Sequence, residues 1–134
     1  MEISTSMLQG KEPVSLMKIK GGISASNFVQ VVRKAQELYN NPARNLIIDL
    51  SDVPEITSAG LAGVHKISLV YSGVALEMDM ESDDPRLDDT HSNKARKHVR
   101  LVNPQPEVDK TLENSGLKFF FRVFPDVDSA LKSF

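Results

Sequence analysis

The chain has 134 residues, with 16 lysine and arginine side chains against 18 aspartate and glutamate side chains, and no cysteine. This length suits one domain with a single core, and the missing cysteines exclude disulfides, thiol catalysis and cysteine-ligated metal centres. A net charge of −2 argues against a domain built mainly to bind nucleic acid. Because the sequence shows neither a long apolar run nor the apolar core of a signal peptide, we expect a soluble, cytoplasmic protein that does not bind membranes.

The first fifty residues predict a loose terminus, a strand, a helix and a second strand. These occupy residues 1–11, 13–20, 26–40 and 45–50. The first strand alternates apolar and polar side chains, and the helix begins after a cap at Ser24 or Ser26. The second strand is almost entirely apolar, which is typical of a strand covered on both faces.

The second half of the chain continues the alternation of helices and strands. It predicts a helix from Ser58 to about Ser72, a strand at 99–103, a helix at 104–114, a strand at 117–124 and a last helix at 126–134. Helices that separate strands in this way indicate a largely parallel sheet. The predicted fold class is therefore α/β, with a mostly parallel sheet of about four strands and interspersed helices in one domain, 1–134.

A segment of different composition, residues 77–97, interrupts this alternation. Seven acidic residues lie in 77–93 with Arg86 as the only basic residue, and a basic run, 94–100, follows. Such charge blocks predict a flexible, solvated insertion. The basic run lacks interleaved aromatic residues and follows acidic ones, so we interpret it as solvated rather than as a nucleic-acid patch.

The motifs of common enzymes are missing. The sequence contains no P-loop and no nucleophile elbow, and the glycines of residues 58–63 do not form a dinucleotide fingerprint. His65 falls within a helical stripe, which indicates packing, and His91 beside Asp88 and Asp89 offers only a weak metal contact. We therefore expect no enzymatic activity, no cofactor and no metal.

Asp49 requires separate consideration because it ends an apolar strand. In this respect it resembles the phospho-acceptor of receiver domains. Receivers also need paired acidic residues after their first strand to hold magnesium, and here that strand is followed by Gly21, Gly22 and Ile23 instead. We interpret Asp49 as a turn-forming strand end.

Two adjacent hydroxyl residues, Thr57 and Ser58, precede a helix start rich in small residues. One of them can serve as the N-cap that accepts a hydrogen bond from a free backbone amide, and spacing alone does not say which. Gly60 and Gly63 each lower helix propensity by about 1 kcal/mol relative to alanine. A sequence tolerates this loss most readily where another backbone must come close.

Three segments carry a resemblance to a known family. They are NLIIDLSDVPEITSAGLAGV at 45–64, VRLVNPQPEVDKTLENSGL at 99–117 and FFFRVFPDVDSAL at 119–131. Family members typically show a D-L-S-x-V strand end, then an S-S-A-G-L or D-S-S-G-L helix start, and later a helix that ends in S-G-L. From residue 13 to its end, the chain resembles a STAS domain, the family of the anti-sigma-factor antagonists.

The resemblance implies a partner-switching regulator. Ser58 falls at the position of the phosphorylatable serine, and the implied partner-binding residues are Ser24, Thr57, Ala59, Gly60 and Leu61. In such a circuit the unphosphorylated protein binds an anti-sigma factor, commonly also a serine kinase, and frees the sigma factor. Phosphorylation ends the complex, and a phosphatase restores it.

Two features depart from the family pattern. Ser24 stands where many antagonists have aspartate after the first strand's glycine turn, and the insertion before residue 98 is longer than the usual link. Three alternatives stay open: a scaffold module of another signalling complex, a small-ligand sensor whose pocket the first-strand turn and the Ser58 loop would line, and an enzyme without recognisable motifs.

Overall fold

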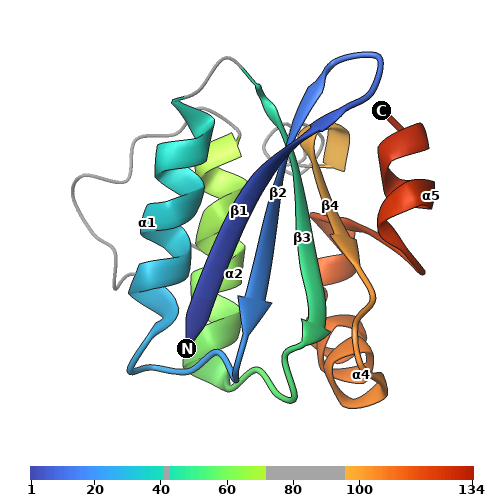
Figure 1. The fold of residues 1–134 in the computed structure, drawn as a ribbon. Coiled ribbons are helices and arrows are strands. Elements are labelled where there is room, and N and C mark those ends of the chain that lie inside the picture. Colours follow the sequence, from blue (N-terminus) through green and yellow to red (C-terminus); the bar gives the residue numbers. More distant parts are fainter. Residues whose placement is uncertain (41–42, 72–95) are drawn as a thin grey trace.

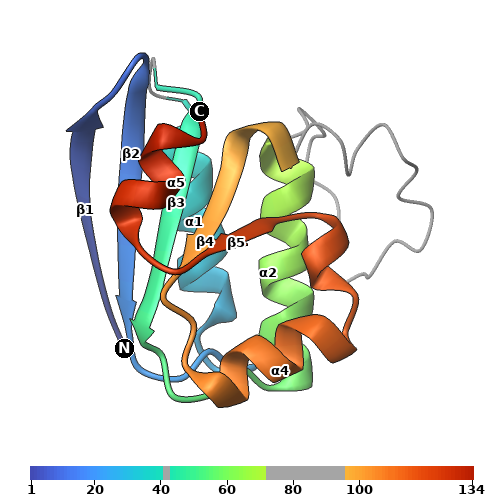
Figure 2. The ribbon, with the colours of Figure 1, turned by 90° about the vertical axis from the view of Figure 1, so that its right-hand side faces the viewer.

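The computed structural model describes residues 1–40, 43–71 and 96–134. Its elements are β1 (Glu2–Gln9), β2 (Pro13–Lys20), α1 (Phe28–Tyr39), β3 (Asn45–Asp52), α2 (Ser58–Tyr71), β4 (Val99–Val102), α4 (Pro106–Asn114), the short 3-10 helix η1 (Leu117–Phe119), β5 (Arg122–Phe124) and α5 (Val127–Lys132). The sheet separates α1 and α2 on one face from α5 on the other (Figures 1 and 2).

The strands lie in the order β1-β2-β3-β4-β5. β1 pairs antiparallel with β2, and the other three pairings are parallel. The predicted α/β class with a mostly parallel sheet is therefore confirmed, with five strands where the sequence predicted about four.

The additional strand corrects the prediction of a loose N-terminus. Residues 2–9 form β1 and pair with all eight residues of β2, from Glu2 opposite Lys20 to Gln9 opposite Pro13. Ile3 packs against the larger core and Leu8 against the smaller one. The serines and threonine between them weaken the apolar alternation, so the strand depends on its pairing with β2 rather than on its own pattern.

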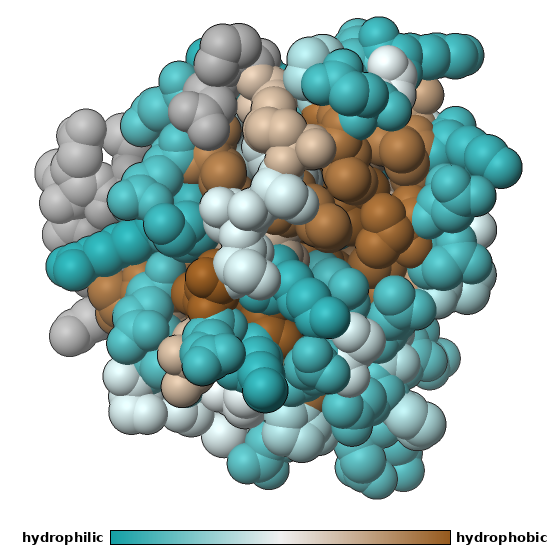
Figure 3. Space-filling model, viewed as in Figure 1, coloured by the Kyte–Doolittle hydropathy of each residue, from teal (hydrophilic) through white to brown (hydrophobic). Residues whose placement is uncertain are grey.

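The two faces of the sheet carry different cores. Because side chains alternate along a strand, neighbouring residues of β3 point to opposite faces: Ile48 joins the core under α1 and α2, whereas Ile47 joins the cluster under α5. The larger core has 21 buried residues and includes Val108 and Leu112 of α4. The smaller has four, and its other members are only partly buried. Figure 3 shows apolar surface in the region where Figure 1 draws the sheet beside α5.

The predicted strand at 117–124 is also corrected. Residues 117–119 form η1, and only Arg122–Phe124 pair with β4. Phe121 is fully buried, whereas Phe119 is 75% exposed. Two residues apart in a strand would share one face, so this contrast requires a helical turn before β5. Gly116, with φ of 80°, supplies the left-handed residue between α4 and η1.

The predicted insertion at 77–97 lies, up to residue 95, outside the described residues, so its character stays a prediction. Among the helices of the described ranges, none is long and apolar enough to cross a membrane.

Candidate functional site

Two loops lie side by side at the carboxyl ends of β2 and β3. Ile23 and Ile56 form an isolated parallel bridge. The Ile23 amide donates to the Glu55 carbonyl at 3.1 Å, and the Thr57 amide donates to the Ile23 carbonyl at 2.9 Å. Because β2 and β3 are parallel neighbours, their carboxyl ends meet at one edge. The chain thus brings Ser24, which follows Ile23, next to the junction of Thr57 and Ser58.

The loop that contains Ser24 is held by Asn27. The Asn27 side chain accepts from the Ser24 amide at 2.9 Å and donates to the Gly22 carbonyl at 2.9 Å. The hydroxyls of Ser24 and Ser26 bond to each other at 3.0 Å. The prediction that Ser24 or Ser26 caps α1 is wrong, because Asn27 occupies the N-cap position and the helix begins at Phe28.

The two hydroxyls at the start of α2 have different roles. Thr57 Oγ1 accepts from the Gly60 amide at 3.2 Å and donates to the Ile23 carbonyl at 3.4 Å. Thr57 is therefore the N-cap, and its hydroxyl is engaged in both directions. Ser58 is the first helical residue; its side chain is exposed and makes no hydrogen bond among the described residues. The structure thereby separates two residues that spacing could not distinguish.

The glycines of α2 face the protein's own interior. A Cβ on Gly60 would lie 2.8 Å from the Ile23 carbonyl carbon, and one on Gly63 would lie 2.7 Å from Phe28 Cβ. Real Cβ atoms essentially never come so close. The close backbone approach expected from these glycines therefore occurs at Gly60, against Ile23 in the loop before α1, whereas Gly63 makes room for the Phe28 side chain of α1. Gly60 is buried and supports the site from beneath, whereas Ala59 and Leu61 are partly exposed.

The start of α2 carries no negative charge of its own, since the first turn has no acidic residue. The first N–H groups of a helix lack intrahelical acceptors and form the positive end of its dipole. α2 is 14 residues long, and its exposed N-terminus therefore presents a positive end directly at the Ser58 hydroxyl.

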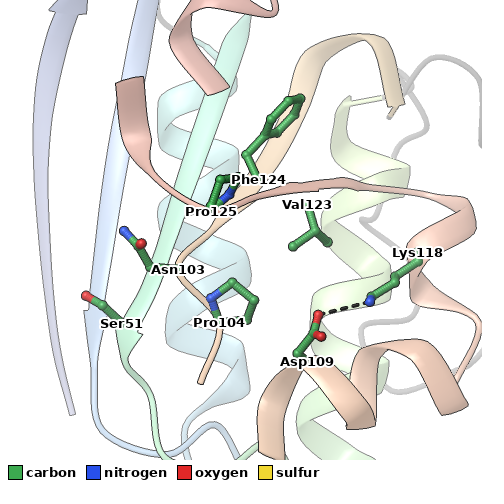
Figure 4. A pocket seen from close by; sticks show the side chains of 8 residues that line it. All are labelled: Ser51, Asn103, Pro104, Asp109, Lys118, Val123, Phe124 and Pro125. Atoms are coloured by element: carbon green, nitrogen blue, oxygen red, sulfur yellow. Dashed lines mark ion pairs between the residues drawn. The ribbon is translucent and has the colours of Figure 1, made fainter. Parts of the chain in front are cut away.

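An open groove of about 630 Å³ lies elsewhere, between α4 and the ends of β3 to β5 (Figure 4). It is lined by Ser51, Asn103, Pro104, Asp109, Lys118, Val123, Phe124 and Pro125. Asp109 and Lys118 form an ion pair of 2.9 Å at its side. No residue of the predicted site lines this groove, so it gives no support to a ligand pocket formed by the first-strand turn and the Ser58 loop. Sequence reasoning missed it because its lining comes from five separate segments.

Of the other candidates, Asp49 and His65 lie within elements of the fold, whereas His91, Asp88 and Asp89 lie outside the described residues. Asp49 is 8% exposed, and its Oδ1 accepts from the Ser51 amide at 2.9 Å. The prediction that it ends the strand in a turn is wrong, because β3 continues to Asp52 and Asp49 pairs with both neighbouring strands. The His65 ring lies edge-on to Phe120, with ring centroids 4.9 Å apart. In the part of the chain that the structure describes, no group of three or more histidine or acidic side chains is placed to hold a metal ion.

Comparisons with known proteins agree with this fold. The model of the STAS domain family matches residues 90–130. A search of curated protein sequences finds no match.

Solved structures match over nearly the whole chain. An anti-sigma-factor antagonist from Mycobacterium paratuberculosis is 20% identical, with a TM-score of 0.66, over 98% of this chain and 93% of that one. The anti-sigma-factor antagonist SpoIIAA in its unphosphorylated form is 14% identical, with a TM-score of 0.65, over 98% and 96%. The Bacillus cell fate determinant SpoIIAA in its phosphorylated form is 14% identical, with a TM-score of 0.55, over 97% and 98%.

At such low sequence identities these matches show that the fold is shared, and they do not show that the partners or the chemistry of those proteins are shared. The motif resemblance, the match of the family model and the fold agree with one another. The resemblance to the STAS family is thus confirmed, and the described part of the chain has the fold of the anti-sigma-factor antagonists.

Proposed function

We propose that this chain is an anti-sigma-factor antagonist that is switched off by phosphorylation of Ser58. Its unphosphorylated form binds an anti-sigma factor that is also a serine kinase, and a phosphatase removes the phosphate to restore binding. The protein acts in the cytoplasm as a binder and a substrate, without catalytic residues or cofactors of its own. Support comes from the fold shared with anti-sigma-factor antagonists, one of which is known in a phosphorylated form.

The observation that carries the proposal is the contrast between the two hydroxyls. The Thr57 hydroxyl is engaged as the cap of α2, whereas that of Ser58 is exposed and makes no hydrogen bond among the described residues. A kinase can reach Ser58 without breaking an internal hydrogen bond. Phosphorylation of Thr57 would remove a cap, which typically costs about 1 kcal/mol of stability.

The fold tolerates a phosphate at Ser58. Phosphorylation adds about −1.5 to −2 charges at neutral pH, at the positive end of a helix whose first turn holds no acidic residue. An anion at such a place typically contributes about 0.3–1 kcal/mol of stabilisation. The modification therefore leaves the protein folded and changes only its surface.

A bound partner does not tolerate the same phosphate. Ser24, Thr57, Ala59 and Leu61, the residues implied in partner binding, carry no charge, and the exposed Glu55 of the same loop is acidic, so none of these side chains can pair with a phosphate. A partner that packs on these residues would have to bury the phosphate dianion away from water, which is strongly unfavourable without a paired cation. A loss of about 2.7 kcal/mol in binding free energy already weakens a complex about a hundredfold.

Capture experiments with Ser58 variants test this function. Tagged wild type, Ser58→Ala and Ser58→Glu are used to capture partners from a lysate of the source cells, and intact mass with fragmentation locates any phosphate. We expect wild type and Ser58→Ala to retain an anti-sigma factor or kinase that Ser58→Glu loses, and one phosphate on Ser58 of wild type.

Asn114→Glu is the control, because Asn114 is an exposed residue of α4, an element that contributes no residue to the site. This variant should retain the partner, and the loss of binding by Ser58→Glu would then be due to the position of the added charge. The proposal fails if all variants capture the same proteins and wild type carries no phosphate.

A further inference from the structure

The two edges of the sheet differ in how they are protected. β5 has only three residues and begins with the exposed Arg122, so it offers a short, charged edge. β1 has eight residues, contains no proline, and carries one charged side chain, Glu2, at its start. Natural proteins usually protect a free edge with short strands, charges, proline or a covering element. From Ile3 to Gln9, β1 has no proline and no charge, and no element of the described residues covers its outer side.

The outer side of β1 is open. Among the described strands β1 pairs only with β2, and in Figure 2 it is the outermost described element on the left, with no described element beyond it. Every second residue of an edge strand directs its N–H and C=O away from the sheet. β1 thus presents a row of unpaired backbone donors and acceptors to solvent.

Exposed apolar side chains gather at this edge. In the described part of the chain, three large apolar residues are exposed: Met1, Met7 and Phe119. Met7 lies in β1, 49% exposed, and Met1 directly precedes the strand. Methionine adapts its shape readily to an apolar surface, so this part of the edge can pack against another strand.

The sequence of β1 complements itself in one antiparallel register. Ile3, Thr5 and Met7 point to the face of α1 and α2, as their partners Ile19, Met17 and Ser15 show. A two-fold axis normal to the sheet keeps every side chain on its own face of the sheet. Directly opposite residues of antiparallel strands share a face, so the axis must lie midway between the two copies of one and the same residue. With the axis at Thr5, Ile3 lies opposite Met7 of the other copy, Thr5 opposite Thr5, and Ser4 opposite Ser6.

Other registers pair less well. With the axis at Ser6, Ile3 would lie opposite Gln9 and Ser4 opposite Leu8. With the axis at Ser4, only residues 2–6 of β1 would pair with the strand of the other copy, Ile3 would lie opposite Thr5, and Met7 would lie opposite Met1, which is outside the strand. In the Thr5 register the interface contains two apolar pairs, each formed by Ile3 of one copy and Met7 of the other, and the two Thr5 side chains meet at the centre. The single charged residue of the strand, Glu2, lies opposite Leu8 rather than opposite another charge. Apolar and Thr–Thr cross-strand pairs are favourable, whereas like charges in opposition are not.

We infer that β1 is an interface between two copies of this chain. The two strands pair antiparallel about Thr5 and join two five-stranded sheets into one continuous sheet. The operation reverses the strand direction, so the two Ser58 sites lie at opposite ends of the dimer and each stays accessible. The inference rests on the edge strand and is independent of the proposed function.

A single cysteine at the axis tests the register. The chain has no cysteine, so Thr5→Cys introduces the only thiol. Opposite residues of antiparallel strands have Cα atoms about 4.5–5.5 Å apart, within the range that a disulfide spans. Diamide then takes two electrons and two protons from the two introduced thiols, and a disulfide bond forms between their sulfur atoms across the axis.

Gln9→Cys is the matched control on the same exposed strand. In the Thr5 register the two thiols introduced by Gln9→Cys are displaced by eight positions, about 27 Å, and cannot bond within the dimer. We expect rapid dimer formation by Thr5→Cys and at least about tenfold slower formation by Gln9→Cys, as random collisions would give. Equal rates for the two variants would overturn the inferred register.

Sedimentation velocity over a range of concentrations tests the dimer itself. Wild type should show reversible dimerisation, and Thr5→Lys should weaken it at least about tenfold, because two lysines then oppose each other at the axis. Asn114→Lys adds the same charge to an exposed residue of α4 and should leave the dimer unchanged. Circular dichroism confirms that both variants are folded. A wild type that stays monomeric at all concentrations, or a Thr5→Lys dimer of unchanged affinity, would refute the interface.

Discussion

The two faces of the sheet differ in how completely they are covered. Among the described residues, the core on the side of α1, α2 and α4 has 21 buried members, whereas the cluster on the side of α5 has four, Val14, Ile47, Val102 and Ala130, with partly buried residues around them. The Ser58 loop is attached to the well-covered side, through Ile23 and the glycines of α2. This difference teaches that the candidate site rests on the most stable layer of the protein, so a surface modification there can change binding without unfolding the chain.

Ile47 and Ile48 provide the sharpest test of this difference, since they are adjacent, chemically identical and both almost fully buried. We expect Ile48→Ala to lower the free energy of unfolding by about 4 kcal/mol, and Ile47→Ala by about 2 kcal/mol. The thinner layer under α5 can collapse around a smaller side chain more easily than the thick one. Urea denaturation measures both values, and equal losses would remove the distinction between the layers.

Gly60 tests how the site is attached to the thick layer. Gly60→Ala forces a Cβ against the Ile23 backbone and should destabilise the protein by about 3 kcal/mol, although alanine favours helices. Gly10→Ala is the control, because its Cβ would meet mainly the flexible end of Leu131, at 3.2 Å. The measurement is again the unfolding free energy. Similar small effects at both glycines would contradict an attachment through close backbone contact.

The two hydroxyls at the start of α2 should differ by a smaller amount. Thr57→Ala removes the cap and should cost about 1 kcal/mol of stability, whereas Ser58→Ala should change stability by less than about 0.5 kcal/mol. Thermal unfolding of the two variants checks this order. If Ser58→Ala were the more destabilising change, Ser58 would be the structural residue and the proposed phosphorylation site would lose its main support.

The smallest effect concerns pH at the opposite end of the sheet. Burial, and then Lys97, lowers the pKa of His98, whose Nδ1 lies 2.9 Å from Asn45 Oδ1. The imidazole of His98 therefore binds a proton more readily in the unfolded chain than in the folded one. Its contribution to the free energy of unfolding is complete above about pH 6.5 and is lost as the pH falls through the lowered pKa. The pH dependence of unfolding between about 7.5 and 5 should be shallower in His98→Gln than in wild type. Identical profiles would show that His98 does not contribute.

Elements with a strong pattern of their own could be predicted from the sequence. The apolar run of β3, the helical spacing of α1 and the small-residue start of α2 indicated their elements and the α/β class. The candidate site followed from the resemblance at 45–64. β1 escaped prediction because serine and threonine interrupt its alternation, and β5 was predicted too long because Phe119 to Phe121 are apolar without sharing a face.

Patterns among residues close together in the chain were enough to predict the fold class, the order of most elements and the two hydroxyls at a helix start. Which of these hydroxyls is free follows from contacts that form only in the folded protein. That choice depends on Ile23, whose carbonyl accepts hydrogen bonds from both the Thr57 amide and the Thr57 hydroxyl across 34 residues of sequence. Contacts between segments distant in the chain leave no local pattern. The different roles of Thr57, whose hydroxyl is hydrogen-bonded, and Ser58, whose hydroxyl has no hydrogen bond among the described residues, therefore emerge only when β2 and β3 pair.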